Sequence, residues 1–175
     1  FKRPILTIID TPGAYPGIGA EERGQAQAIA HNLFEMSELK TPIISVVLGE
    51  GGSGGALAIG VADVLLMFEH SIYAILSPEG YASIIYKDSK MAKEVSDMMK
   101  ITAKDLKDLK IIDDIIKEKE GLHINSIDPF DEFKDVLRKT IKKLKAIPTD
   151  KLIENRYQKY RKIGIYEEMK EENHE

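Results

Sequence analysis

The sequence is dominated by a run of glycines between two apolar segments. Within Leu48-Gly49-Glu50-Gly51-Gly52-Ser53-Gly54-Gly55-Ala56, five of the nine residues are glycine. The apolar, β-branched residues 42–48 precede the run, as in a buried strand, and the small apolar residues 56–62 follow it, as in a buried helix. A glycine turn lets a ligand approach bare backbone, and the N–H groups of the first helical turn have no partner inside the helix. The run therefore predicts a site for an anion, or for an oxygen that gains negative charge during a reaction.

A second loop is expected at the same edge of the sheet. Residues 4–9 predict a buried strand, and residues 10–19, with two prolines and three glycines, predict a loop after it. Apolar residues at helical spacing then predict one long amphipathic helix from about Glu21 to Leu39. Strand, helix and strand indicate a right-handed parallel crossover, which brings the loops 10–19 and 49–55 together at the carboxyl ends of their strands.

The remaining residues predict short strands and helices, with a change of composition at Pro129. We expect a core of residues 1–128, C-terminal helices in residues 129–164, and a disordered acidic tail in residues 165–175. The first C-terminal helix has a basic side, which we interpret as a solvent-facing surface rather than an anion site. The expected elements of the core are strands at 64–68 and 71–76, a helix capped by Ser77 with Pro78 at its first position, a helix at 87–100, a helix from Thr102, and a short strand within 111–116.

Composition excludes several classes of function. The net charge of −4 argues against general affinity for nucleic acid or anionic membranes, and no apolar run is long enough to span a membrane. The chain has no cysteine and only four scattered histidines, so we expect no disulfide, no catalytic thiol and no metal site. We expect a cytoplasmic α/β protein. Because the chain starts at Phe1, directly before a strand, we also expect that an N-terminal portion of the natural protein is missing.

Two side-chain mechanisms are weak alternatives. The segment 51–55 matches G-x-S-x-G, the turn that carries the serine nucleophile of many hydrolases, but only His70 and His123 could serve Ser53 as a base. Residues Asp10 to Gly13 resemble the D-x-x-G switch of GTPases, but the phosphate loop and the N-K-x-D motif are absent from the sequence.

A third mechanism uses the backbone. Two glycine loops at one sheet edge can offer N–H donors to a carbonyl oxygen that gains charge, and this chemistry needs no side-chain nucleophile. Glu21, Glu22 and Glu50 are candidate acid or base groups for such a reaction, although each also suits a helix start or a solvated loop.

Two long motifs resemble one family closely. Residues 10–25, DTPGAYPGIGAEERGQ, and residues 49–60, GEGGSGGALAIG, are similar to the signatures of the carboxyltransferase α subunit of bacterial acetyl-CoA carboxylase. The segments Ser77-Pro78-Glu79-Gly80 and Ile101 to Asp113 match as well, so the resemblance extends over nearly all of residues 1–165. Tyr81 and Tyr86 depart from the residues that are usual in this family.

The resemblance implies a crotonase-like fold of repeated ββα units. It also implies a reaction in which a carboxyl group passes from carboxybiotin, on a carrier protein, to acetyl-CoA and forms malonyl-CoA for fatty acid synthesis. The implied partners are a carboxyltransferase β subunit in an α₂β₂ assembly, the biotin carboxyl carrier protein and biotin carboxylase. No metal is implied in this chain.

The family motifs also imply particular site residues. The backbone N–H groups of Gly54 and Gly55 would bind the ureido oxygen of biotin and stabilise the charge that remains when the carboxyl group departs. The other residues implied to bind the cofactor are Gly13, Ala14, Gly17, Ile18, Gly19, Gly51, Gly52, Ser53 and Ala56. Another biotin-dependent acyl-CoA carboxyltransferase or decarboxylase, a GTP-binding switch domain and a scaffold without catalysis remain the alternatives.

Overall fold

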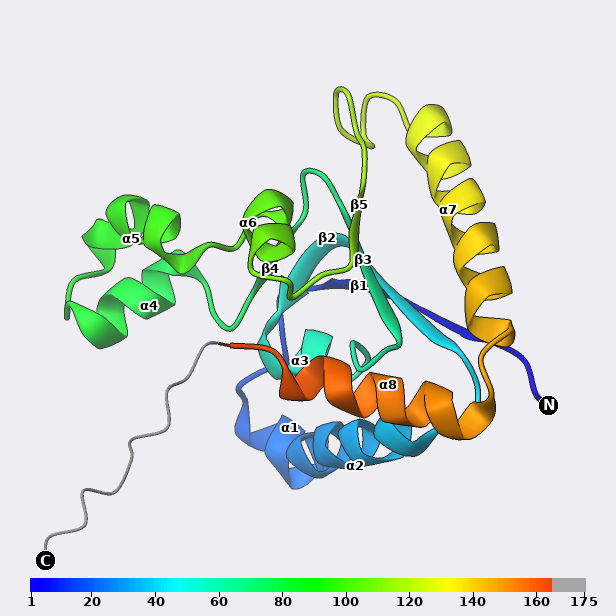
Figure 1. Cartoon of the computed structure of the whole chain (residues 1–175). Coiled ribbons are helices and arrows are strands. Elements are labelled where there is room, and N and C mark those ends of the chain that lie inside the picture. Colours follow the sequence, from blue (N-terminus) through cyan, green and yellow to red (C-terminus); the bar gives the residue numbers. More distant parts are fainter. Residues whose placement is uncertain (165–175) are drawn as a thin grey trace, which may run out of the picture.

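The computed structural model describes residues 1–164 as an α/β fold around a mostly parallel sheet (Figure 1). The expected acidic tail, residues 165–175, lies outside the described residues. The strands are β1 (Ile5–Thr11), β2 (Ile43–Gly52), β3 (Val64–Phe68), β4 (Ile72–Ala74) and β5 (Asp114–Ile116). The helices are α1 (Ile18–Glu22), α2 (Gln25–Glu38), α3 (Ser53–Leu57), α4 (Pro78–Ile85), the short 3₁₀ helix η1 (Ser89–Met91), α5 (Ala92–Met99), α6 (Ala103–Asp108), α7 (Ile127–Lys145) and α8 (Thr149–Arg161).

Strand β2 organises the sheet because it pairs with three other strands. The strand order is β1-β2-β3-β5, and all of these pairs are parallel. The first half of β2 pairs with β3, in the register Ile44 opposite Val64, whereas its second half pairs with β4, in the register Gly51 opposite Tyr73. The parallel crossover expected from the sequence is thus confirmed, and it brings the glycine run to the carboxyl edge of the sheet.

Helices cover the two faces of the sheet unequally. On one face, Ile9, Val47 and Met67 pack with Ala56 of α3 and Leu106 of α6. On the other face, the strands pack against α7 and α8. The buried residues of that second cluster are Ile44, Val46, Leu66, Phe68, Ile116, Leu144 and Leu152. The basic side of α7 is exposed, as expected for a solvent-facing surface; it consists of Arg138, Lys139, Lys142, Lys143 and Lys145.

Several expected element bounds were wrong. The strand expected at 71–76 is limited to Ile72–Ala74, and the helix expected at 87–100 is the short η1 followed by α5. The single helix from Glu21 to Leu39 is two helices, because Gly24 has φ +80° and separates α1 from α2. Strand β2 does not end at Leu48 but continues to Gly52, because β4 provides a partner for its glycines. The following helix starts at Ser53 and ends at Leu57, earlier on both sides than the expected range 56–62. The division of the chain at residue 128 stays a prediction; Asp128 is the second residue of α7.

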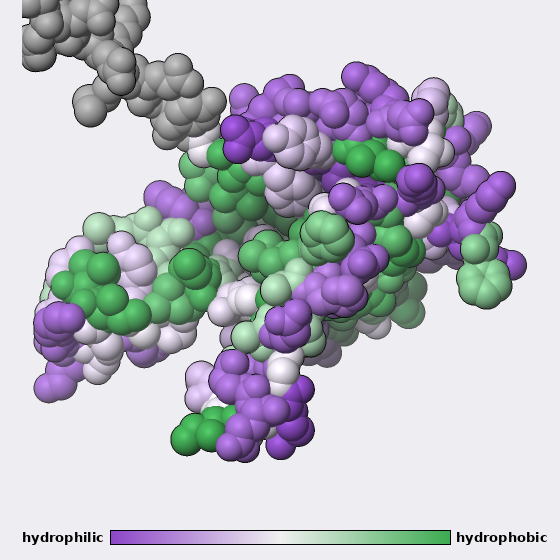
Figure 2. All heavy atoms as spheres, turned by 90° about the horizontal axis from the view of Figure 1, so that it is seen from below, coloured by the Kyte–Doolittle hydropathy of each residue, from purple (hydrophilic) through white to green (hydrophobic). Residues whose placement is uncertain are grey.

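An arm of three helices, α4, η1 and α5, stands apart from the sheet (Figure 1). Its start follows the sequence closely, since the Ser77 hydroxyl accepts a hydrogen bond from the N–H of Gly80 and Pro78 occupies the first turn of α4. Figure 2 shows hydrophobic side chains on the surface of this arm. Ile84 of α4 and Met98 of α5 are 60% and 61% exposed.

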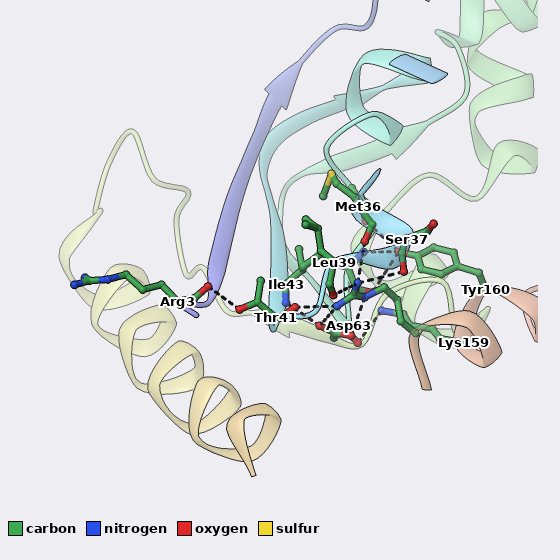
Figure 3. Close-up of polar contacts among 12 residues, drawn as sticks. Arg3, Met36, Ser37, Leu39, Thr41, Ile43, Asp63, Lys159 and Tyr160 are labelled. Carbon is green, nitrogen blue, oxygen red and sulfur yellow. Dashed lines mark hydrogen bonds and ion pairs between the residues drawn. The ribbon is translucent and has the colours of Figure 1, made fainter. Parts of the chain in front are cut away.

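A buried ion pair fixes α8 to the body of the protein (Figure 3). The Arg156 guanidinium donates to both carboxylate oxygens of Asp63 at 2.9 Å, and the two side chains are 1% and 4% exposed. Its remaining N–H groups donate to the carbonyl oxygens of Met36 and Leu39 at 2.9 Å and of Thr41 at 3.0 Å. Arg156 therefore caps the C-terminal end of α2 and holds the turn that leads into β2.

We expect Arg156→Met to lower the free energy of unfolding by about 3–5 kcal/mol, because it leaves the Asp63 carboxylate buried without its partner. Chemical denaturation measures the change. Arg161→Met is the matched control, since Arg161 is exposed on the same helix, and its effect should stay within about 0.5 kcal/mol. Equal effects of the two substitutions would contradict this account of the ion pair.

Tyr160 gives a second prediction, on pH. Burial raises the pKa of the Tyr160 phenol to about 12. A pKa that is higher in the folded than in the unfolded protein stabilises the fold below the unfolded value, about 10, and this stabilisation is lost as the pH rises through about 12. The difference in unfolding free energy between the wild type and Tyr160→Phe should therefore be constant below pH 10 and shrink above it, in denaturation curves measured at successive pH values.

Candidate functional site

The glycine run is half strand and half helix. Gly51 lies between Thr11 of β1 and Tyr73 of β4, and Gly52 is the last residue of β2. Ser53 then turns the chain into α3 with φ +54°, a conformation that residues other than glycine seldom adopt. The chain thus leaves the sheet through one strained residue and presents the first turn of α3 at the sheet edge.

The two glycine loops touch through their backbones. A Cβ atom on Gly52 would lie 2.1 Å from the carbonyl oxygen of Pro12, and one on Gly55 would lie 2.8 Å from the carbonyl carbon of Gly13 and 2.9 Å from the nitrogen of Ala14. Gly13 itself has φ +133° and packs on the Cβ atom of Ser53. Glycine is required at these positions because no side chain fits between the segments. The structure therefore brings together Gly13, Ala14, Gly52, Ser53 and Gly55, as the sequence predicted.

Gly54 differs from its neighbours in the run. A Cβ atom there would lie 3.6 Å from the Cδ1 atom of Ile29, which is ordinary van der Waals contact. The N–H groups of Gly54 and Gly55 belong to the first turn of α3, where no earlier carbonyl of the helix can accept from them. Both groups are therefore available as donors at the positive end of the helix.

The other residues expected at the site lie either on the protein surface or in the hydrophobic core, and not at the contact between the two glycine loops. Gly17 packs on the ring of Tyr15, Gly19 faces the guanidinium of Arg23, and Ile18 is 80% exposed. Ala56 is fully buried in the core, where it anchors α3. Contact between these residues and a ligand stays a prediction.

Two cavities share Ala74 of β4 in their linings and reach the glycine run. The first has a volume of about 440 Å³ and an apolar wall, and it is lined by Ser53, Gly54, Leu57, Tyr73, Ala74, Ile75, Leu106 and Ile111. The second, of about 260 Å³, is bounded by Pro12, Gly51, Gly52 and the start of the helical arm. Glu50 and Glu79 line this second cavity, so Glu50 is at the site while Glu21 and Glu22 are exposed on α1.

Tyr73 is a site residue that sequence reasoning missed. Its ring packs on Gly51, where a Cβ atom would lie 2.6 Å from the Cδ2 atom of Tyr73, and it forms a wall of the first cavity. Burial raises the pKa of its phenol, so the hydroxyl stays protonated at neutral pH. The only sequence signal was an aromatic residue in a strand of unknown pairing.

The geometry does not support the side-chain mechanisms. His70 and His123 line a different cavity, beside Leu48 and Gly121, and in residues 1–164 neither histidine contacts Ser53 through a hydrogen bond. Asp10 is engaged within the fold, because its carboxylate accepts the N–H of Glu50 at 3.0 Å. Neither of the two side-chain mechanisms has its partner groups in place, so the geometry favours the mechanism that uses the backbone amides.

Two further findings concern the described part of the chain as a whole. Within residues 1–164, no three histidine, aspartate or glutamate side chains gather closely enough to hold a metal ion. Over the same range, no helix combines the length and the apolar character needed to cross a membrane.

Comparison with solved structures defines the class of fold. A Pseudomonas malonate decarboxylase hetero-tetramer in complex with coenzyme A has a chain that matches 89% of this one with a TM-score of 0.73 at 18% identity, over 61% of its own length. Transcarboxylase 12S matches 98% of this chain with a TM-score of 0.61 at 22% identity, over 30% of its own length. The chain has the crotonase-like α/β fold that the sequence motifs predicted.

Comparison of sequences defines the family. Residues 1–164 match the family described as acetyl co-enzyme A carboxylase carboxyltransferase-like, and the chain belongs to that family. The acetyl-coenzyme A carboxylase carboxyl transferase subunit alpha of Clostridium botulinum (strain Eklund 17B / Type B) is 56% identical over 168 residues, which are 95% of this chain and 61% of the relative. The same subunit of Alkaliphilus oremlandii is 56% identical over 167 residues, 95% of this chain and 53% of the relative. The chain thus spans between about half and three fifths of the length of these relatives.

The steric difference between neighbouring glycines gives a matched test. Gly55→Ala should destabilise the protein by about 1–3 kcal/mol, because the new Cβ atom meets the backbone of Gly13 and Ala14, which cannot move aside as a side chain can. Gly54→Ala should leave stability within about 1 kcal/mol of the wild type, since the methyl group finds normal contact with Ile29. Thermal unfolding of both variants checks the order; the reverse order would overturn the backbone contact described here.

Proposed function

We propose that this chain is the carboxyltransferase portion of an acetyl-CoA carboxylase α subunit, which passes a carboxyl group from carboxybiotin to acetyl-CoA and so forms malonyl-CoA for fatty acid synthesis. The observation that carries the proposal is the pair of first-turn N–H groups of Gly54 and Gly55, which have no hydrogen-bond acceptor within residues 1–164, in a chain of this family, with Gly54 lining an apolar cavity. Donors fixed in this way stabilise an oxygen on which charge develops, which is the demand of carboxyl transfer.

The residues present fit a biotin ring. Within the Gly52–Gly55 segment Ser53 carries the one side chain, and the adjoining cavity of about 440 Å³ is mostly apolar, as the sulfur-containing ring and the acyl chain of biotin require. When bound, biotin supplies the carboxyl group in a labile form. Gly54 and Gly55 would then hold its ureido oxygen, and Tyr73 and Leu57 would exclude water from the cavity.

The remaining expected cofactor contacts are part of the same proposal. The backbone of Gly13 and Ala14 packs against Gly55, and Gly51 and Gly52 form the end of β2 that leads into the turn. Gly17, Ile18 and Gly19 would close the pocket only when a partner or the carrier protein is present, since Ile18 is exposed in this chain. We propose no metal in the site.

The proposed assembly contains more than this chain. We propose a β subunit that provides the second oxyanion site, for the thioester of acetyl-CoA, together with the biotin carboxyl carrier protein and biotin carboxylase. Exposed apolar residues on the helical arm and on α1 are compatible with such contacts, and the malonate decarboxylase of similar fold is itself a hetero-tetramer. We propose that the complex works in the cytoplasm.

The experiment is the reverse half-reaction, in which malonyl-CoA loses its carboxyl group to biotin or to the biotinylated carrier protein. It uses the full-length α subunit that contains these residues, co-expressed with its β subunit. Gly54→Pro removes one N–H donor at the second position of α3, where the N–H group has no partner within the helix, and should lower kcat by about 10²–10³. Gly54→Ala keeps the donor and should retain most of the activity.

Two outcomes would contradict the proposal. A wild-type complex that transfers no carboxyl group from any acyl-CoA would refute the assigned reaction. Equal activity of Gly54→Pro and Gly54→Ala in assembled complexes would refute the assigned role of the Gly54 N–H group. Comparing malonyl-CoA with methylmalonyl-CoA in the same assay separates an acetyl-CoA enzyme from one that prefers a larger acyl group.

A further inference from the structure

Helix α3 is too short to hold its own direction. It contains only the five residues Ser53–Leu57, and few contacts within so short a helix oppose its rotation or displacement. Its first turn rests on the backbone of Gly13 and Ala14. The contacts at the C-terminal end of α3 therefore determine how well the N–H groups of Gly54 and Gly55 are oriented.

Two hydroxyl groups from the sheet hold the turn that follows α3. The carbonyl oxygen of Ile59 lies 2.7 Å from Oγ1 of Thr7 and 3.2 Å from Oγ of Ser45, and the two hydroxyl oxygens are 2.7 Å apart. Thr7 is on β1 and Ser45 on β2, opposite each other in the sheet register. Ser45 is fully buried, so these hydrogen bonds do not compete with solvent.

A third hydroxyl comes from the last described helix. Tyr160 of α8 donates to the carbonyl oxygen of Gly60 at 3.1 Å and accepts the N–H of Ala62 at 2.8 Å. Tyr160 lies one helical turn after Arg156, whose buried ion pair with Asp63 holds α8 in place; Asp63 and Tyr160 are labelled in Figure 3. The position of the Tyr160 hydroxyl is therefore fixed independently of α3.

Hydrogen bonds connect this anchored turn back to the site. The N–H of Gly60 donates to the carbonyl oxygen of Leu57 at 3.0 Å, and the N–H of Ala58 donates to that of Gly54 at 2.9 Å. The anchored carbonyl groups and the amides of the site thus belong to one continuous hydrogen-bonded segment, residues 54–60. A shift at its end changes the direction of the first-turn N–H groups.

We propose that Thr7, Ser45 and Tyr160 are positioning residues, whose hydroxyl groups orient the Gly54 and Gly55 amides toward the reacting oxygen. This inference rests on the proposed function, because it gives the hydroxyl groups a role in carboxyl transfer. None of the three lines either of the two cavities at the glycine run. Their contribution is to transition-state stabilisation, which depends on alignment, and much less to the binding of acyl-CoA on the partner subunit.

Tyr160→Phe in the assembled α–β complex is the first test. It should lower kcat of the malonyl-CoA half-reaction by about tenfold while KM for malonyl-CoA changes by less than about twofold, since small displacements of catalytic groups cost rate rather than affinity. Tyr157→Phe is the matched control, because Tyr157 is an exposed tyrosine of the same helix. The assay is run well below the unfolding temperature of every variant, so that loss of stability alone would leave kcat unchanged.

Thr7 offers a rescue by the conservative substitution. Thr7→Val keeps the shape of the side chain and removes the hydroxyl, and it should lower kcat by a similar factor of about ten. Thr7→Ser restores the hydroxyl and should restore most of the rate. Equal rates for the serine and valine variants would overturn the proposal, as would an unchanged kcat in Tyr160→Phe.

Hydrogen exchange separates this inference from the proposed reaction. Amides of residues 54–62 should exchange faster in Tyr160→Phe than in Tyr157→Phe, measured by mass spectrometry on the intact complex. If the wild type is inactive but the exchange rates differ, the assigned reaction fails and the anchoring of α3 stands. If exchange in residues 54–62 is the same in both variants, the positioning role fails whatever the activity.

Discussion

The site depends on a contact between two segments of bare backbone, Pro12–Ala14 and Gly52–Gly55. Packing at this distance is open only to glycine, and it costs conformational entropy because glycine loses more freedom on folding than any other residue. The strained Ser53 adds to that cost. Strands β2 and β3 contribute buried residues to both hydrophobic clusters and β1 adds Ile9 to one of them, and this burial of apolar surface compensates for the cost.

Helix α8 contacts the turn that follows α3, at the end of α3 away from the Gly54 and Gly55 amides. Arg156 and Asp63 are buried as a hydrogen-bonded pair, and they place Tyr160 against the turn after α3. A buried ion pair is costly to desolvate and adds little net stability over an apolar contact, but it accepts only one arrangement of its partners. We interpret the pair as a device that sets geometry, which matches the need of a site built from backbone dipoles.

Much of this structure was readable from the sequence. Periodicity located the strands and most helices, Ser77 and Pro78 marked the start of α4, and the glycine run marked the site. What failed depends on contacts distant in sequence. The extension of β2 to Gly52 requires β4 as a partner, and Tyr73 lines the cavity only because that pairing places it beside Gly51. The break at Gly24 had a local signal, a glycine inside a helical pattern, which the apolar spacing on either side obscured.

The anchoring of α3 by α8 has a consequence for the order in which the protein can be completed during synthesis. Roughly a hundred residues separate Gly54 from Tyr160, so the ribosome makes the catalytic turn well before the helix that secures it. At about 5–20 residues per second, this interval lasts on the order of 5–20 s. During that time the Gly54 and Gly55 amides are present at the sheet edge but lack their final orientation. A nascent chain that stopped before Arg156 would contain every residue of the site without the Arg156 and Tyr160 hydrogen bonds that align the amides.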